Sequence, residues 1–266
     1  MSIPPQAFLV VFFVLPALIM VLASFRYPGE FGGLAPLRKA AGMQGDAGLT
    51  TETYRFLFGD IVFTEIFARS LLVALATTLF CLAMAYPLAY AMAHRPRRQR
   101  DIMVLLVILP FASNFLIRIY AWIILLGPLN LLYSPAAVVL GMVYVHLPFM
   151  VLPLYTNLER HDPALLDAAR DLGARGWQRF WKITFPLSMP GIFSGSALVF
   201  IPVLGMFAVP ELLGGTGDVL VGNLIKEQFL ESRDWPFGAA LSLVLTLLVL
   251  GVAALSARMA GRRARQ

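Results

Sequence analysis

The sequence predicts an all-α, polytopic membrane protein with six transmembrane helices. Three observations predict it: an apolar composition, six long apolar runs, and an uneven distribution of Lys and Arg between them. The chain has 266 residues, of which 59% are hydrophobic and only 14% are charged, and its mean hydropathy is +0.78. Soluble domains carry about 25% charged residues. Because polar side chains are too few to cover a water-facing surface, most of the surface is expected to face lipid.

The six apolar runs are each long enough to cross about 30 Å of hydrocarbon as a helix. They cover residues 7–25, 70–93, 102–126, 136–155, 191–213 and 237–257. The first run has no basic segment before it and is long for a signal-peptide core, so we interpret it as a retained span, with a cleaved signal as the alternative. Together the six runs fit one transmembrane domain over residues 1–266. Cys81, the single cysteine, lies within the second run, so it is expected to pack in the bundle and cannot form an intrachain disulfide.

The basic residues lie in short clusters between the apolar runs. Segments 94–101, 156–189 and 258–266 hold 13 of the 21 Lys and Arg residues, whereas segments 26–68 and 214–236 hold six. Basic residues favour the cytoplasmic side of a membrane, so this asymmetry predicts that both termini are cytoplasmic. The same clustering explains the net charge of +6 without a nucleic-acid partner.

Two segments are then expected on the external side. Residues 26–69 are long and rich in glycine in their middle, which favours irregular backbone. Residues 214–236 contain apolar positions at helical spacing over 219–229, which predicts a short helix lying against the bundle.

The cytoplasmic segment 158–190 has more structure than a simple connector needs. Asp162-Pro163 is an acidic N-cap followed by proline, which predicts a helix start, and Gly173 is placed to end that helix. A second amphipathic stretch, Trp177–Thr184, follows, and Pro186 is expected to end it. The physical pattern fits either a knob that docks on a protein partner or a helix lying on lipid headgroups.

A resemblance separates these two alternatives. Segment 158–190 resembles the EAA loop of type I ABC-importer permeases, at the positions Asp167-Ala168-Ala169, Gly173-Ala174, Ile183, Pro186-Leu187 and Pro190-Gly191. Asp167 stands where that family usually has Glu, so the carboxylate is kept one methylene shorter. The resemblance implies a type I ABC importer permease fold. It also implies that Asp167, Ala168, Ala169 and Gly173 form a coupling helix seated in a cleft of a cytoplasmic ATPase.

The resemblance extends over nearly all of the chain from the second run onward. Residues 114–122, 148–153, 210–215 and 233–238 are similar to the spermidine/putrescine branch of these permeases. This implies a permease subunit that moves polyamines across the bacterial inner membrane. The implied partners are an ATP-binding-cassette ATPase dimer, a second homologous permease subunit and a periplasmic substrate-binding protein, besides the lipid bilayer itself.

Glu211 is the strongest candidate for handling a polycation inside the membrane. It is the only carboxylate within the six apolar runs, and it lies about 31 Å along the helix from Pro190 at 1.5 Å per residue, near the external mouth of the path. A carboxylate can replace the water of a multiply charged amine by Coulomb attraction. The alternatives are a carboxylate that reaches the outer interface, or one that pairs with Arg118.

Three further side chains are candidates for lining the path. Tyr120 and Trp122 offer aromatic faces for cation–π contacts, although an interfacial aromatic belt explains them almost as well. Asn114 is a polar candidate in the same run. Arg118 is interpreted as structural, because a cation path would repel a guanidinium that faced the substrate.

No catalytic constellation is present in the sequence. There is no phosphate-binding loop, no HExxH motif and no Gly-x-Ser-x-Gly motif, and the three histidines lie far apart. The chain is therefore expected to be a non-catalytic subunit without cofactor or metal, driven by a separate ATPase. Two alternatives stay open: a type I importer permease for ferric ion, sulfate, thiamine or an opine, and a membrane scaffold that docks a cytoplasmic partner.

Overall fold

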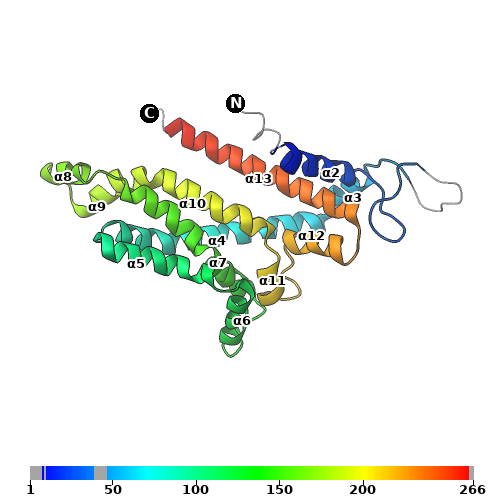
Figure 1. Ribbon diagram of the computed structural model, residues 1–266, viewed down its shortest axis with the longest axis horizontal. Coiled ribbons are helices and arrows are strands. Elements are labelled where there is room, and N and C mark those ends of the chain that lie inside the picture. The colour runs from blue at the N-terminus through cyan, green and yellow to red at the C-terminus, as the bar shows by residue number, and fades with distance from the viewer. Residues whose placement is uncertain (1–7, 9, 39–46, 264–266) are drawn as a thin grey trace. The chain divides into compact units, whose positions relative to one another are not determined.

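The computed structural model describes residues 8, 10–38 and 47–263, and in this part of the chain the regular elements are all helical (Figure 1). In chain order they are η1 (Val10–Val14), α2 (Leu15–Ser24), α3 (Glu52–Gly59), α4 (Ile61–Ala93), α5 (Arg97–Ile108), η2 (Leu109–Ala112), α6 (Phe115–Leu126), α7 (Pro135–Glu159), α8 (Pro163–Asp171), α9 (Gly176–Arg179), η3 (Phe180–Thr184), α10 (Phe185–Gly205), α11 (Ala208–Leu213), α12 (Val221–Leu230) and α13 (Trp235–Arg263).

The helices are long and apolar enough for a membrane protein. Four of them qualify as spans within the described residues: 61–93, 135–159, 176–205 and 235–254. A fifth span results if the bent pair 97–112 and 115–126 is taken as one, and the first apolar run appears as the shorter helix Val10–Ser24. The all-α membrane fold is therefore confirmed, while the count of six spans stays a prediction.

The run 102–126 is not one continuous helix. It is broken after the 3₁₀ turn η2, and the helices on either side are bent by 92°. Pro110 lies in this turn and lacks the N–H that a continuing helix would use. Asn114 then starts α6 as its N-cap, since its Oδ1 accepts a hydrogen bond from the Leu116 N–H at 2.8 Å.

The run 191–213 is also interrupted, which the sequence did not predict. Helix α10 ends at Gly205, residues 206–207 are not helical, and α11 begins at Ala208. The break leaves carbonyl groups without helical partners, and the Asn223 Nδ2 donates to the Phe207 carbonyl oxygen at 3.1 Å. Gly222 allows this approach, because a Cβ there would lie 2.6 Å from the Gly205 carbonyl oxygen.

Segment 26–69 has irregular backbone over residues 26–38 and 47–51, as expected, while residues 39–46 of its glycine-rich middle lie outside the described residues. Its second half forms α3 and the first turns of α4, and Asp60 separates the two helices, with its Oδ1 accepting from the Val62 N–H at 3.0 Å. The expected short helix over 219–229 is confirmed as α12.

The chain divides into two compact units. The first comprises residues 1–70, 205–208 and 219–252, and the second comprises 71–204, 209–218 and 253–266. The first unit has a core around Leu57, Leu224, Phe237 and Leu241, from helices α3, α12 and α13.

Helix α7 is the centre of the second unit. Of its apolar window 61% is buried, against 28–39% in the other three long spans. Close contacts with α7 occur at three glycines of the unit. A Cβ would lie 2.8 Å from Asn157 Cβ at Gly191, 2.8 Å from Met150 Sδ at Gly195, and 2.4 Å from Leu213 Cδ1 at Gly141. The two ends of α7 are thus held against α10 and α11 by small residues.

Candidate functional sites: a helical knob and a short acidic helix

The knob formed by α8 and α9 begins at a well-defined helix cap. The Oδ1 of Asp162 accepts a hydrogen bond from the Ala164 N–H at 2.9 Å, and Pro163 occupies the first helical position. An acidic N-cap satisfies an orphan N–H and interacts favourably with the helix dipole. The helix start that the sequence predicted is confirmed.

The end of α8 is set by Gly173. Its φ is +78°, and the Gly173 N–H donates to the Arg170 carbonyl at 2.9 Å while the Ala174 N–H donates to the Ala169 carbonyl at 3.0 Å. This pair of bonds is a Schellman motif, in which glycine avoids the steric penalty of the left-handed conformation. The expected role of Gly173 as a helix stop is confirmed.

The second amphipathic stretch does not end at Pro186. Residues 176–205 form one continuous helix that passes through the π-helical turn Phe180–Thr184. Within this turn the Phe185 N–H reaches back to the Phe180 carbonyl. A π-turn is wider than an α-turn, which relieves the clash between a proline ring and the carbonyl four residues earlier. The knob is therefore rigidly continuous with α10.

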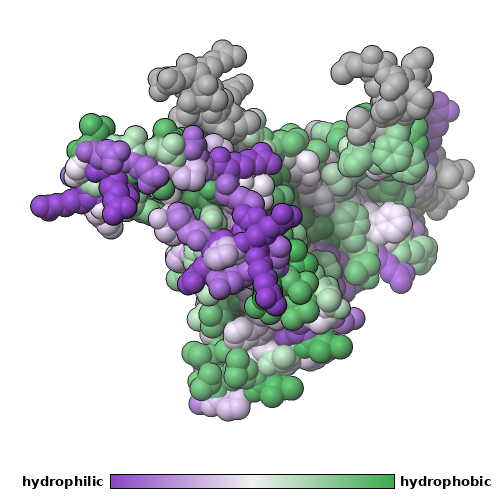
Figure 2. Space-filling view, turned by 60° about the vertical axis from the view of Figure 1, so that its left-hand side comes forward, coloured by the Kyte–Doolittle hydropathy of each residue, from purple (hydrophilic) through white to green (hydrophobic). Residues whose placement is uncertain are grey.

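The knob presents apolar side chains on its outside. Leu172 is 88% exposed and Trp177 is 72% exposed. Trp177 packs against Trp181 with ring centroids 5.4 Å apart. Their hydrophilic neighbours along the chain include Arg170, Asp171, Arg175 and Gln178. Figure 2 shows hydrophilic side chains gathered on the side turned forward from the left of Figure 1, where α8 and α9 lie. Exposed apolar groups with a polar rim are typical of a surface that binds a partner.

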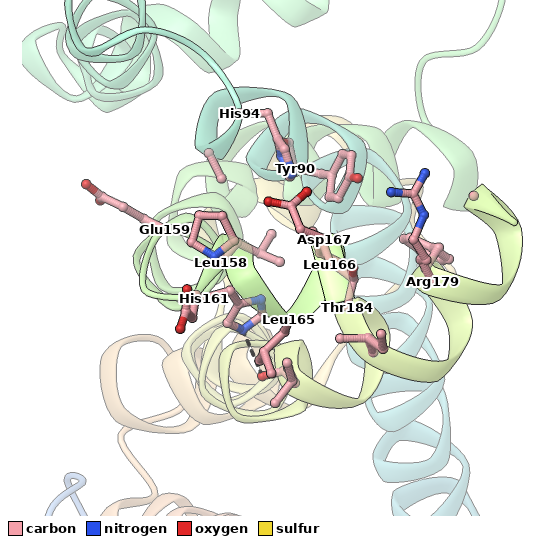
Figure 3. Close-up of a pocket in the computed structure, with 17 residues that line it drawn as sticks. Tyr90, His94, Leu158, Glu159, His161, Leu165, Leu166, Asp167, Arg179 and Thr184 are labelled. Carbon is pink, nitrogen blue, oxygen red and sulfur yellow. Dashed lines mark hydrogen bonds between the residues drawn. The ribbon is translucent and has the colours of Figure 1, made fainter. Parts of the chain in front are cut away.

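A cavity of about 420 Å³ lies between α8, α9 and the ends of α4 and α7 (Figure 3). Asp167 lines it, near Tyr90 of α4 and His94, the residue that follows α4. The His161 Nε2 forms a hydrogen bond with the Leu187 carbonyl oxygen at 3.2 Å on its far side. Arg179 also lines the cavity, so both signs of charge occur in it.

Of the four predicted coupling residues, three are exposed and one is half-buried. Asp167, Ala168 and Gly173 are exposed, whereas Ala169 is half-buried. No atom lies within 4 Å of a Cβ built on Gly173, so a partner can approach the backbone there. The cavity behind Asp167 was not predicted, because its α4 residues lie about 75 positions earlier in the sequence.

Glu211 lies at the opposite end of the second unit from the knob. It is exposed in the first turn of α11, and the buried Val209 and Leu213 on the same helix face Gly141 of α7. The Tyr133 N–H donates to the Leu213 carbonyl at 2.9 Å, which ties α11 to the loop that follows α6. Glu211 is therefore held near the start of α7.

The three other predicted path residues all belong to α6. Trp122 is half-buried and packs edge-to-face on Tyr144 of α7, with ring centroids 5.6 Å apart. Tyr120 is 53% exposed. Asn114 uses its side chain to cap α6, which is a structural use that the sequence analysis did not assign.

Arg118, also on α6, is half-buried. Its Nε is buried and has no hydrogen-bond partner among the described residues. A buried guanidinium nitrogen without a partner costs free energy.

The knob and the Glu211 region are thus joined by α7. Figure 1 shows α8 and α9 at one end of α7, and α6 and α11 at the other. From Gly141, which contacts α11, to Glu159 at the helix end is about 27 Å at 1.5 Å per residue. The Gly191-xxx-Gly195 spacing on α10 is the sequence feature that lets α10 pack closely against α7, and it was not used in the prediction.

Comparisons with known proteins agree with this architecture. The family described as "Binding-protein-dependent transport system inner membrane component" matches residues 85–265. The spermidine/putrescine transport system permease protein PotB of Escherichia coli (strain K12) is 44% identical over 217 residues, covering 75% of this chain and 78% of that protein. PotB of Haemophilus influenzae (strain ATCC 51907 / DSM 11121 / KW20 / Rd) is 43% identical over 218 residues, covering 76% of each.

Among solved structures, the fold is similar to a chain of the bacterial alginate ABC transporter in complex with an alginate-bound periplasmic protein. The TM-score is 0.74 at 15% identity, with 97% of this chain and 92% of that chain covered. A sequence identity of 15% supports a shared fold and nothing about function. With the family match over residues 85–265, the chain belongs to the family of binding-protein-dependent transport system inner membrane components.

Proposed function

We propose that this chain is the permease subunit of a bacterial ATP-binding-cassette importer that carries polyamines of the spermidine/putrescine type. The observation that carries the proposal is the 44% identity to a spermidine/putrescine permease over 217 residues. The chain's own geometry supports it, since a capped and glycine-terminated helix at one end of α7 is paired with an acidic short helix at the other.

The proposed protein lies in the inner membrane as a single permease domain with both termini in the cytoplasm. The clusters of Lys and Arg in segments 94–101, 156–189 and 258–266 support this orientation. It puts the knob on the cytoplasmic side and Glu211 towards the external side.

In this proposal α8 is the coupling helix, seated in a cleft of one subunit of a cytoplasmic ATPase dimer. The exposed Asp167, Ala168 and Gly173 face the ATPase, and the exposed rings of Trp177 and Trp181 extend the contact. Because residues 176–205 form one helix, a displacement of the knob is transmitted directly into α10. ATP hydrolysis takes place in the partner, and this chain is non-catalytic and uses no cofactor.

The substrate path in this proposal runs past Glu211, Tyr120, Trp122 and Asn114, completed by a second homologous permease and supplied by a periplasmic binding protein. Glu211 is exposed on α11 and carries the charge that attracts an ammonium group. The aromatic rings of Tyr120 and Trp122 add cation–π contacts of about 0.5–1 kcal/mol each at exposed sites.

The test is uptake of labelled putrescine and labelled sulfate by cells that express the complete transporter, with wild type and Glu211→Gln compared. We expect putrescine uptake in the wild type, reduced at least about tenfold in the variant, because removing a charged hydrogen-bonding partner costs about 1.5–3 kcal/mol. Sulfate uptake in the wild type without putrescine uptake would overturn the assignment.

Arg118 favours an anionic substrate as the second candidate. Its buried Nε has no hydrogen-bond partner in the described part of the chain, and an anion in the path could supply one. If this candidate is right, Arg118→Gln abolishes the uptake of sulfate and Glu211→Gln leaves it unchanged.

A further inference from the structure

The first compact unit contains a second cavity that the proposed transport path does not use. Its volume is about 400 Å³, and it is lined by the first external loop, the starts of α3 and α4, and the region where α12 leads into α13. A volume above about 300 Å³ is sufficient for a small organic ligand. All of its lining residues belong to the same unit.

The lining of this cavity is acidic. Glu52 and Asp234 contribute carboxylates, and among the described residues that line it there is no Lys or Arg. This is notable because Arg55 and Arg233 are close neighbours of those two acids in the sequence, in a chain whose net charge is +6. The Oδ1 of Asp234 accepts from the Phe237 N–H at 3.0 Å, and no bond in the described residues occupies its other oxygen. The local charge therefore attracts cations.

One wall of the cavity is aromatic. The rings of Phe56, Phe63 and Phe237 contact one another, with centroid distances of 5.3 Å, 5.7 Å and 5.2 Å for the pairs Phe56–Phe63, Phe56–Phe237 and Phe63–Phe237. Tyr27 adds a fourth ring from the first external loop. Phe56 is 57% exposed although it lies in this cluster. Aromatic faces combined with carboxylates are the groups that recognise ammonium ions.

The cavity is built on a fixed base. Phe237 is 7% exposed and belongs to the core that contains Leu57 and Leu241. The Gly33 N–H donates to the Arg233 carbonyl at 2.8 Å, which ties the first external loop to the turn before α13. The Glu52 N–H donates to the Thr50 Oγ1 at 3.1 Å, which fixes the start of α3. A site held in this way loses little conformational entropy on binding.

We propose that this cavity, here named the outer amine site, binds a protonated alkylamine, with Glu52 and Asp234 pairing with its ammonium groups and the ring face of Phe56 making a cation–π contact with one of them. The inference deepens the proposed function and rests on it, because that function sets a polyamine as the substrate and puts segments 26–69 and 214–236 on the external side. The outer amine site then holds the polyamine before it reaches Glu211.

The test is equilibrium binding of radiolabelled putrescine to the purified full-length chain in detergent. We expect Glu52→Gln and Asp234→Asn each to raise the dissociation constant about tenfold, since each removes one charged partner. We expect Phe56→Leu to raise it about threefold through the lost cation–π contact. The amide of Asp234→Asn can still accept from the Phe237 N–H, so α13 keeps its cap.

Two matched control variants lie outside the cavity. Glu227→Gln removes an exposed carboxylate of α12, and Phe58→Leu removes a ring of α3 that is 70% exposed. Both are expected to leave the dissociation constant within twofold of wild type. Equal losses in the controls and in the cavity variants would overturn the proposal, as would putrescine binding that none of the variants changes.

The binding measurement tests the outer amine site, and the uptake measurement tests the proposed function. If the complete transporter takes up putrescine but the purified chain binds none below about 10 mM (a standard free energy near −2.7 kcal/mol), the outer amine site is wrong and the proposed function stands. If the chain binds putrescine through Glu52 and Asp234 but the transporter imports none, the proposed function fails and the site remains an amine site. Uptake in which Glu52→Gln raises KM about tenfold and leaves Vmax unchanged supports both.

Discussion

The N–H of Ala174 donates to the carbonyl oxygen of Ala169 at 3.0 Å, and this bond closes α8 over Gly173 with its φ of +78°. Helix α8 is thereby terminated at a fixed residue, and the chain turns back towards α9. The surface of α8 and α9 that a partner ATPase would contact therefore depends on the backbone conformation of Gly173.

Substitutions at Gly173 test whether the end of α8 depends on its left-handed backbone conformation. A Cβ there meets no atom within 4 Å, so Gly173→Ala is expected to act only through the left-handed conformation, at a cost of about 1–2 kcal/mol. Gly173→Asn should cost less, because Asn tolerates this conformation. Measured uptake should fall in the order Gly, Asn, Ala, and Gly173→Trp should abolish it by blocking the close approach. Normal uptake by Gly173→Trp would contradict the assignment of α8 as the coupling helix.

Asp162 tests the start of the same helix. Asp162→Ala removes the acceptor for the Ala164 N–H and is expected to cost about 1 kcal/mol, while Asp162→Asn should cost much less because Asn is also a good N-cap. Co-purification of the ATPase with each variant is the measurement. Loss of the ATPase in both variants alike would show that charge, and not helix capping, is what matters at this position.

Gly141 tests the packing that positions Glu211. A Cβ at Gly141 would lie 2.4 Å from Leu213 Cδ1 and 2.9 Å from Val209 Cγ1, so Gly141→Val should displace α11. Overpacking of this kind costs about 1–3 kcal/mol. We expect lower thermal stability and reduced putrescine uptake. Gly251→Val is the matched control, since a Cβ at Gly251 meets nothing within 4 Å, and it should behave as wild type.

Asn223 tests the break between α10 and α11. Asn223→Asp removes the donor to the Phe207 carbonyl and sets a carboxylate against it. Leaving that carbonyl unpaired is expected to cost about 1–3 kcal/mol. The melting temperature of the purified chain in detergent should fall by several degrees. An unchanged melting temperature would show that the break at residues 206–207 does not need this bond.

The knob was largely predictable from sequence because local chemistry determines it. Asp162, Pro163 and Gly173 each act on the backbone within a few residues, so their pattern is sufficient to mark the start and end of α8. The prediction that Pro186 ends the second amphipathic stretch was wrong, because the effect of this proline is not determined locally. Its effect depends on the π-turn before it, and nothing in the local sequence distinguishes a π-turn from an α-turn.

Hydropathy measures composition and not backbone continuity, so it marks the long apolar runs without their breaks. Pro110 and Asn114 are local signals for the 92° bend, because Pro110 lacks the N–H that a continuing helix needs and Asn114 caps α6. The break at Gly205 depends on Asn223, which follows 18 residues later, so only the tertiary structure reveals it. The two cavities were missed for the same reason, since each is lined by segments far apart in the chain.

The most direct test of a polyamine importer permease is ATP-driven uptake into proteoliposomes that contain this chain with its ATPase, second permease and binding protein. We expect labelled putrescine to accumulate inside only when ATP is supplied, and Glu211→Gln and Gly173→Trp each to remove the accumulation. ATP-dependent accumulation of sulfate, with none of putrescine or spermidine, would contradict it.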